Sequence, residues 1–387
     1  MMKKLLCMLM LLGVLIGAVS AQTENQNTVI HGFYEVNSDM GAADASLLAR
    51  EMNLMFEEFI QLFRFDTKNL PGSLKVRAFV SKEAYDNYVF SKLNRIRDGA
   101  IYLHYTNPDR RELIVHRVGG VSPEILAHQA FIQFIRGFIP NTPSWMRDGF
   151  GIYFSKLHYD RIKDSLVYEE NLAWLETVKS WGSLAPSIES VMFADIDGIP
   201  EHFQPASWAL VSFLMNNSNE EYRRLLFESF MLLSPTATAA ENTLMIMQRI
   251  SSWANTETLK DDYTNYFASR RTFSGFIEEG RAAYDAKDPI KAEELFQDAL
   301  KVRTDHYAPY YYLGLLAYEA KNYDAAEQYY RSSLQYGADQ ALLQYAMGLN
   351  ALSAGRNDDA QIFLRQASLL SPERYRTRAE ELLSRIN

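Results

Sequence analysis

Two short stretches of the sequence carry residue types that could support a hydrolytic site. Residues 126–132 read LAHQAFI and contain a histidine, and residues 143–150 read PSWMRDGF and contain an aspartate. Imidazole and carboxylate groups are common metal ligands, and a bound metal ion can activate water for attack on an amide. The candidates for that chemistry are His128 and Asp148. Next to the histidine stands Gln129, whose neutral amide has no useful pKa for proton transfer near neutrality.

Both stretches lie on predicted helices that follow a small predicted sheet. The segment SPEILAHQAFIQFIRGF has Ser122 as a helix cap and Pro123 at the first helical position. A second helix is predicted after Thr142-Pro143, through WMRDGFGIYFSKL, and more helix follows to about residue 270. Earlier in the chain, DASLLAREMNLMFEEFIQLFRF predicts an amphipathic helix. Strands are predicted at VIHGFYEV, LKVRAFV, AIYLHYT and RELIVHRV, with turns at Pro71-Gly72 and Asn107-Pro108, the second closing a hairpin.

This order of elements resembles the gluzincin metallopeptidases, the peptidase MA-like group, over about residues 28–235. Their first helix carries H-E-x-x-H, and LAH at 126–128 matches its start. The later segments FQPASWALVSFLMN and EEYRRLLFESF resemble the helices that follow the site in these domains. The second helix of the family is matched by Pro143, Trp145, Met146, Gly149, Phe150 and Tyr153.

The departures from the family pattern decide the expected function. The resemblance places His128 at the first ligand position, Gln129 at the base and Ile132 at the second ligand position, and it places Asp148 at the third, where the family has Glu. Residues four apart share one helical face, so two histidines there would face one metal ion. Ile132 has no lone pair to offer, and a catalytic zinc site needs three protein ligands and a water. We therefore expect a non-catalytic pseudo-enzyme that holds no metal and no other cofactor.

Other residues could in principle rescue such a site. His116 precedes the first helix, Glu124 lies one turn before His128, and His158 follows the second helix. Surface or hydrogen-bonded roles are the more common fate of such residues, and His128 itself could be a structural histidine bonded to Asp148. No G-x-S-x-G motif occurs, and the DIDG segment at 195–198 is expected to be a polar turn, because the last ligand position of a calcium loop would fall on Ala206.

The C-terminal third contains a three-unit repeat of 34 residues. Small residues and large residues each recur in this register, so that the two helices of a hairpin can approach closely and share a core with their neighbours. The pattern resembles the tetratricopeptide repeat over residues 275–372, and the amphipathic segment ERYRTRAEELLSRI is expected to cap it. The recurring positions are Gly280, Gly314 and Gly348; Ala283, Ala317 and Ala351; Ala292, Ala326 and Ala360; Ala299, Ser333 and Ala367; and Phe296, Tyr330 and Leu364.

The resemblance to tetratricopeptide repeats implies a concave groove that binds a protein or peptide partner. An equally weighted alternative is that the groove packs against the preceding domain or a neighbouring subunit. The residues expected to line the groove are Ile277, Arg281, Tyr284, Tyr311, Leu315, Tyr318, Tyr345, Leu349 and Leu352.

The first 21 residues are expected to be a signal peptide. Two lysines precede an apolar run, and Val19-Ser20-Ala21 offers small residues at the cleavage position. The single cysteine, Cys7, lies inside this run, so the mature chain would contain no thiol. No second stretch is long and apolar enough to cross a bilayer, which predicts an exported protein of the periplasm or cell envelope. A net charge of −9 disfavours nucleic-acid binding.

Together these patterns predict an α+β domain followed by an all-α helical-repeat solenoid. The expected division is a signal peptide at 1–21, a gluzincin-like core with a small mixed sheet at 28–160, a helical extension at 161–270 and three repeats with a capping helix at 275–387. The expected function is an exported non-catalytic scaffold that recruits a partner through its repeats. An active zinc metallopeptidase with an atypical site and a cell-envelope assembly factor are the alternatives. The oligomeric state stays open.

Overall fold

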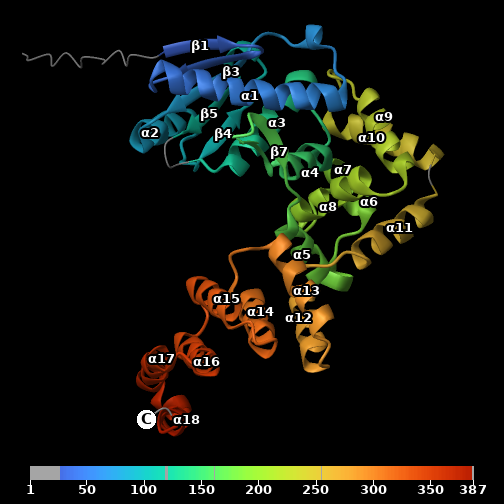
Figure 1. Ribbon diagram of the computed structural model, residues 1–387. Helices are drawn as coiled ribbons and strands as arrows, with labels where there is room; N and C mark the ends of the chain where they lie inside the picture. The colour runs from blue at the N-terminus through green and yellow to red at the C-terminus, as the bar shows by residue number, and fades with distance from the viewer. Residues whose placement is uncertain (1–26, 118–120, 161, 254, 386–387) are drawn as a thin grey trace, which may run out of the picture. The chain divides into compact units, whose positions relative to one another are not determined.

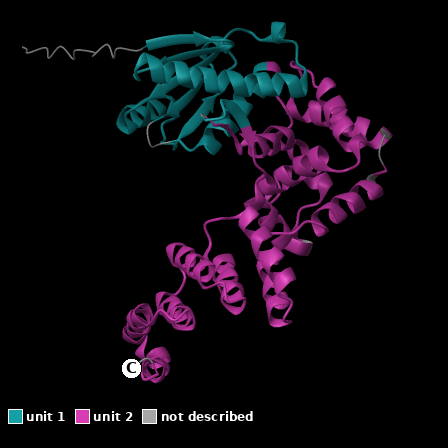
Figure 2. Ribbon diagram, in the orientation of Figure 1, with its two compact units in different colours: residues 1–137, 161–166 teal, residues 138–160, 167–387 magenta. Residues whose placement is uncertain are grey.

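The computed structural model describes residues 27–117, 121–160, 162–253 and 255–385, so the predicted signal peptide lies outside it. The chain divides into two compact units (Figure 2). Unit 1 comprises residues 1–137 and 161–166, and unit 2 comprises residues 138–160 and 167–387. We term the helices that contain LAHQAFI and PSWMRDGF the first and second motif helices. The observed boundary falls near the end of the first motif helix rather than at residue 160. Among the described residues, no helix is both long and apolar enough to cross a membrane.

Unit 1 contains the predicted small mixed sheet, with strands in the order β1-β2-β3-β5-β4 (Figure 1). The β1–β2 and β4–β5 pairs are antiparallel, and β3 runs parallel to both β2 and β5. The β4–β5 pair confirms the hairpin predicted around Asn107-Pro108. The strand bounds are β1 Asn27–His31, β2 Tyr34–Ser38, β3 Leu74–Phe79, β4 Ala100–Leu103 and β5 Glu112–His116.

The segment VIHGFYEV is a hairpin, so its prediction as one strand was wrong. Gly32 has a φ of +55°, a left-handed conformation that glycine adopts without strain, and it turns the chain between β1 and β2. The N–H of Phe33 donates to Oδ1 of Asn53 at 3.0 Å, which ties this turn to α1 (Ala42–Phe63). The alternation of residue types continues through the turn, which is why the pattern alone indicated a single strand.

Helices cover both faces of the sheet in unit 1. On one face, α1 and α3 (Pro123–Phe138) meet through aromatic rings, and the centroids of Phe59 and Phe131 lie 5.3 Å apart. On the other face, Tyr85 and Val89 of α2 pack on Ile114 of β5. Helix α2 (Lys82–Leu93) was not predicted, because only these two of its residues are fully buried and its sequence carries no clear apolar stripe. Two 3₁₀ turns complete the unit, η1 Thr67–Asn69 and η2 Pro108–Arg110.

The first part of unit 2 is a layer of helices built around the α4–α8 pair. A Cβ on Gly149 would lie 2.5 Å from the carbonyl oxygen of Ser207, so only glycine allows α4 and α8 to approach this closely. A short hairpin of β6 Leu157–Asp160 and β7 Ser165–Tyr168 follows α4. The helices are α4 Ser144–Phe154, α5 Leu172–Trp181, α6 Ile188–Met192, α7 Ala194–Asp197, α8 Phe203–Asn216, α9 Glu220–Met231, α10 Ala239–Trp253 and α11 Thr256–Ala268, with the 3₁₀ turn η3 Gly182–Leu184.

The predicted three-unit helical repeat is confirmed. In each hairpin the recurring glycine lies against the large residue 16 positions later, and a Cβ on Gly314 would approach Tyr330 to 2.5 Å. Gly280 meets Phe296 and Gly348 meets Leu364 in the same way. The hairpins are α12 Phe273–Asp285 with α13 Pro289–Val302, α14 Tyr307–Glu319 with α15 Tyr323–Gln335, and α16 Gln340–Ser353 with α17 Asn357–Leu370, followed by α18 Pro372–Leu383.

Candidate functional site

The predicted base position holds a glutamine that is engaged at both ends. Oε1 of Gln129 accepts a hydrogen bond from the backbone N–H of Tyr102 at 2.9 Å. Tyr102 lies on β4, the strand at the edge of the sheet, so this bond uses a donor that the sheet itself leaves unpaired. Nε2 of the same amide lies 3.1 Å from Nδ1 of His128. Gln129 therefore connects the sheet edge to the histidine.

This arrangement fixes the proton on His128. Because Oε1 of Gln129 accepts from a backbone N–H, the Nε2 group must face His128 and donate to Nδ1. Nδ1 is then an acceptor, and the neutral imidazole carries its proton on Nε2. Ile132, four residues later, is half-buried.

The N-terminus of α4, the second motif helix, is capped by a carboxylate that is distant in the sequence. Pro143, the residue before α4, has no side-chain acceptor, and Asp195 supplies one instead. Its Oδ2 accepts from the N–H of Ser144 at 2.7 Å, and its Oδ1 accepts from the hydroxyl of Ser144 at 2.6 Å. A carboxylate is favoured at a helix N-terminus because the first N–H groups have no partner within the helix. The prediction of a polar turn at the DIDG segment was wrong, because Ala194–Asp197 form the short helix α7, from which Asp195 reaches Ser144.

Asp148, the predicted third ligand position, is paired with the residue before it. Nε and NH2 of Arg147 donate to its two oxygens at 2.7 and 3.0 Å, so the guanidinium holds both ends of the carboxylate. Both side chains are about one-fifth exposed. Asp148 belongs to unit 2 and His128 to unit 1. The predicted bond between them stays a prediction, while the observed partner of each is its sequence neighbour.

The three rescue candidates lie in different surroundings. His116 ends β5, is buried, and packs beside the ring of Tyr85 with centroids 5.8 Å apart. Glu124 is exposed in the first turn of α3. His158 lies on β6 in unit 2, with Nδ1 3.4 Å from the carbonyl of Lys156. The structure therefore gives His116 and His158 packing and backbone partners of their own.

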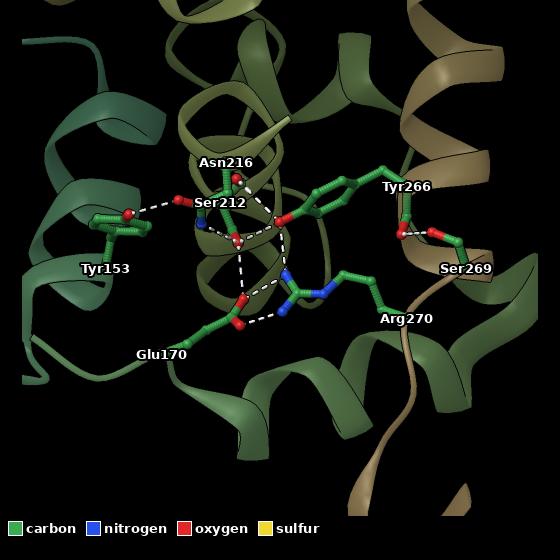
Figure 3. Close-up of polar contacts among 7 residues, drawn as sticks. All are labelled: Tyr153, Glu170, Ser212, Asn216, Tyr266, Ser269 and Arg270. Carbon is green, nitrogen blue, oxygen red and sulfur yellow. Dashed lines mark hydrogen bonds and ion pairs between the residues drawn. The ribbon is translucent and has the colours of Figure 1, made fainter. Parts of the chain in front are cut away.

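A polar cluster in unit 2 escaped the sequence analysis (Figure 3). The guanidinium of Arg270 pairs with both oxygens of Glu170 and donates to the hydroxyl of Tyr266 at 2.6 Å. Ser212 extends the cluster, with its hydroxyl 3.4 Å from Glu170 and from Tyr266. Burial lowers the pKa of Arg270, but the hydrogen bonds and charge of Glu170 raise it more, so the net pKa lies above its usual value. The residues come from α8, α11 and the segments beside α5 and α12.

The same cluster reaches the second motif helix. Nδ2 of Asn216 donates to the hydroxyl of Ser212 at 3.4 Å, and its Oδ1 accepts from the hydroxyl of Tyr153 at 3.0 Å (Figure 3). Tyr153 also stacks on Tyr168, with ring centroids 4.9 Å apart. Burial raises the pKa of both tyrosines, so both stay protonated and act as hydrogen-bonding groups. These contacts connect α4, α8, α11 and the segments before α5 and α12.

Two side chains of helix α5 contact the segment that leads into the repeats, one at the end of α11 and one at the start of α12. Nζ of Lys179 donates to the carbonyls of Ala268 and Arg270 at the C-terminal end of α11. Oε1 of Glu176 accepts from the N–H and the hydroxyl of Ser274 at 2.9 and 3.1 Å, in the first turn of α12. A cation at one helix end and an anion at the next match the partial charges of those ends. With Glu170, these residues form what we term the linker clamp (Glu170, Glu176, Lys179 and Arg270).

The residues predicted to line the repeat groove lie on α12, α14 and α16. Arg281 is exposed, and the other eight are half-buried. Two of the tyrosines form contacts in the repeat register, because the hydroxyl of Tyr284 donates to Glu319 at 2.6 Å and that of Tyr318 lies 3.1 Å from the hydroxyl of Ser353. Tyr345 stacks on Tyr375 of α18, with centroids 4.9 Å apart. The half-buried set is Ile277, Tyr284, Tyr311, Leu315, Tyr318, Tyr345, Leu349 and Leu352.

The fold thus defines a chain in which a mixed α/β unit precedes a helical layer and three helical repeats. No protein-family model matches the sequence, and no curated protein matches it. Among solved structures it is similar to YrrB, described as a TPR protein with an unusual peptide-binding site. The two share 16% sequence identity, the likeness covers 52% of this chain and 93% of that chain, and the TM-score is 0.26. The repeat assignment therefore rests on this chain's own register.

Proposed function

We propose that the chain is a non-catalytic scaffold that holds a protein or peptide partner on the inner face of its repeats. We use the term repeat face for the groove residues on α12, α14 and α16. The observation that carries the proposal is the row of tyrosine and leucine side chains on this face, half-exposed and repeated in the 34-residue register. Tyrosine provides large contact area at low cost in conformational entropy, which suits it to recognition surfaces.

The tyrosines of the repeat face are already ordered. Tyr284 and Tyr318 are each held by a polar residue about one repeat later in the chain, at 2.6 and 3.1 Å. A side chain that is fixed before binding loses less freedom when the partner arrives, which strengthens binding for a given contact area. Tyr345 differs, because it is stacked on the capping helix and contributes to the end of the solenoid.

The same proposal assigns no catalytic role to the gluzincin-like part. The donor set there does not fit a catalytic zinc ion, because Ile132 offers no ligand atom and Arg147 holds both oxygens of Asp148. Gln129 bridges Tyr102 and His128 and cannot remove a proton from water. We propose that the motif helices serve as framework, that the protein needs no cofactor, and that it is exported to the periplasm or cell envelope through its N-terminal segment.

The test is a capture experiment that compares matched pairs of leucine substitutions. We expect the double variant Leu315→Gln with Leu349→Gln to lose the proteins that the wild-type chain captures from cell-envelope extract, because both residues belong to the repeat face. The control is Leu369→Gln with Leu370→Gln on α17, where the side chains are 80% and 48% exposed and lie outside the repeat face.

Quantitative mass spectrometry of the captured proteins gives the answer. A partner retained by the control and lost by the repeat-face variant supports the proposal, provided both variants unfold cooperatively like the wild type. Equal capture by both variants would show that the partner binds elsewhere. Stoichiometric zinc in the purified chain, with chelator-sensitive cleavage of casein, would support the peptidase alternative instead.

A further inference from the structure

Unit 1 contains a polar cavity on the sheet face that carries α2. Its volume is about 280 Å³, close to the lower limit of small-molecule pockets. Strand residues Asn37 and Arg77 form its floor, α2 contributes Tyr88, and the connection from β4 to β5 contributes Tyr105. The floor residues share one face because Asn37 and Arg77 are register partners on β2 and β3. The cavity lies where α2 leaves the sheet uncovered.

The charge of this cavity differs from that of the whole chain. The chain carries a net charge of −9, whereas the side chains lining the cavity include more cations than anions. Glu112 is already neutralised, because its two oxygens accept from Nε of Arg77 at 3.2 Å and from the hydroxyl of Tyr88 at 2.8 Å. Burial and this bond raise the pKa of Tyr88 to about 12. The lining cations are Lys75, Arg77, Lys92, Arg110 and Arg111, and the anions are Glu35, Asp109 and Glu112.

Two of the cations lie over aromatic rings. Nζ of Lys92 lies 4.9 Å from the ring centre of Tyr88, and the guanidinium carbon of Arg110 lies 4.6 Å from that of Tyr105. No carboxylate of the described residues pairs with either cation, and both side chains are exposed. On the floor, Oδ1 of Asn37 is buried and has no hydrogen-bond donor among the described residues. The cavity thus has positive charge without a carboxylate partner at its rim.

We propose that this cavity binds a small oxyanion, a carboxylate or phosphate compound, with Lys92 and Arg110 as its charge partners. Charge-assisted hydrogen bonds to such groups are stronger than neutral ones. The site is separate from the repeat face and from the motif helices, so it is a second binding function of the chain.

In the experiment, the full chain is titrated with inorganic phosphate and, separately, with citrate at constant ionic strength. Binding is measured by isothermal titration calorimetry. We expect saturable binding of at least one of them, and the double variant Lys92→Gln with Arg110→Gln weakens it by about tenfold. The single variant Arg110→Gln gives an intermediate loss. Substitution of these exposed side chains leaves the unfolding midpoint unchanged, which a thermal melt checks.

A matched control separates a site from general attraction between charges. Lys291→Gln with Arg365→Gln removes the same charge from exposed positions on α13 and α17. Binding retained by this control and weakened in the cavity variant supports the proposal. Three results would overturn it: neither anion saturates, the cavity variant binds as tightly as the wild type, or the control loses as much affinity as the cavity variant.

Discussion

Gln129 has two hydrogen-bonding partners at the position where the gluzincin-like pattern would place a general base. A glutamate there would be a base, whereas the amide offers a donor and an acceptor at once. It uses both, on His128 and on the edge-strand N–H of Tyr102. The glutamine at this position is visible in the sequence. Its partner on the sheet is not, because the contact to Tyr102 joins residues 27 positions apart across the fold.

Restoring the carboxylate alone is expected to restore nothing. In Gln129→Glu, Ile132 still leaves the second ligand position empty of donor atoms, and Arg147 still holds Asp148. We expect less than stoichiometric zinc by elemental analysis and no cleavage of casein above background. Stoichiometric zinc in this single variant would show that other residues complete a metal site.

A second residue-scale prediction concerns the repeat glycines. Gly314→Ala places a methyl group 2.5 Å from the ring of Tyr330, which is buried and cannot move aside. Overpacking of this kind costs about 1–3 kcal/mol in the free energy of unfolding. The matched control is Gly275→Ala, whose new Cβ would have only an ordinary contact with Thr272. Chemical denaturation should show a loss for Gly314→Ala alone, and equal stability of the two variants would contradict the assigned hairpin packing.

The linker clamp is the main device at the scale of elements. Its members Glu170, Glu176, Lys179 and Arg270 fix the end of α11 and the start of α12 from one side. Each contact joins residues about 90 to 100 positions apart, and so it has no signal in local periodicity.

Removing the guanidinium of Arg270 from the linker clamp should destabilise the segment between α11 and α12. Arg270→Ala leaves the half-buried Glu170 without its partner, and we expect a loss of about 1–3 kcal/mol in unfolding free energy, reduced because both side chains are about one-fifth exposed. Faster proteolysis between residues 268 and 274 should accompany it. Arg271→Ala, at a side chain 53% exposed, is the control and should change stability by less than about 0.5 kcal/mol. If both variants are cut at the wild-type rate, the clamp does not order the linker.

The capping helix offers a test by pH. Asp339 accepts from the N–H of Leu342 and pairs with Arg374 of α18 at 2.8 Å, and these contacts lower its pKa. A lowered folded pKa gives a stability contribution that is complete above the unfolded pKa of about 3.9 and is lost as the pH falls below it. Asp339→Asn keeps the cap and removes the charge, so it should cost up to about 0.5 kcal/mol at pH 7. Urea unfolding should show that difference shrink as the pH falls through the lowered folded pKa of Asp339, and a difference that does not shrink would assign it to packing.

The elements were predictable where local pattern and burial agree. The 34-residue register predicted the repeats, because in each one a glycine packs against the large residue 16 positions later. Helix α2 was missed because it buries little, and the β1–β2 hairpin was predicted as one strand because the alternation of residue types continues through the turn at Gly32. The cap that Asp195 gives to α4 and the linker clamp depend on tertiary contacts, which a single sequence does not display.

At the scale of the whole molecule, the chain combines two compact units with different surfaces. Unit 1 has an oxyanion-sized polar cavity, and unit 2 ends in a repeat face of ordered tyrosines and leucines. Polar side chains of the motif helices already have partners. Gln129 bonds His128 and the edge strand β4, Asp148 bonds Arg147, and Tyr153 bonds Asn216 of the polar cluster. The proposed division of work is that the repeats hold a partner while the peptidase-like elements provide framework.

The most direct test of this account is the intact mass of the captured partner. The complex eluted from the full chain is incubated with added zinc, and the partner is then measured by mass spectrometry with and without a chelator. The account predicts a partner of full length that stays bound in both samples. Fragments of the partner that form with zinc and disappear with the chelator would contradict it, because they would show that the chain cuts what it holds.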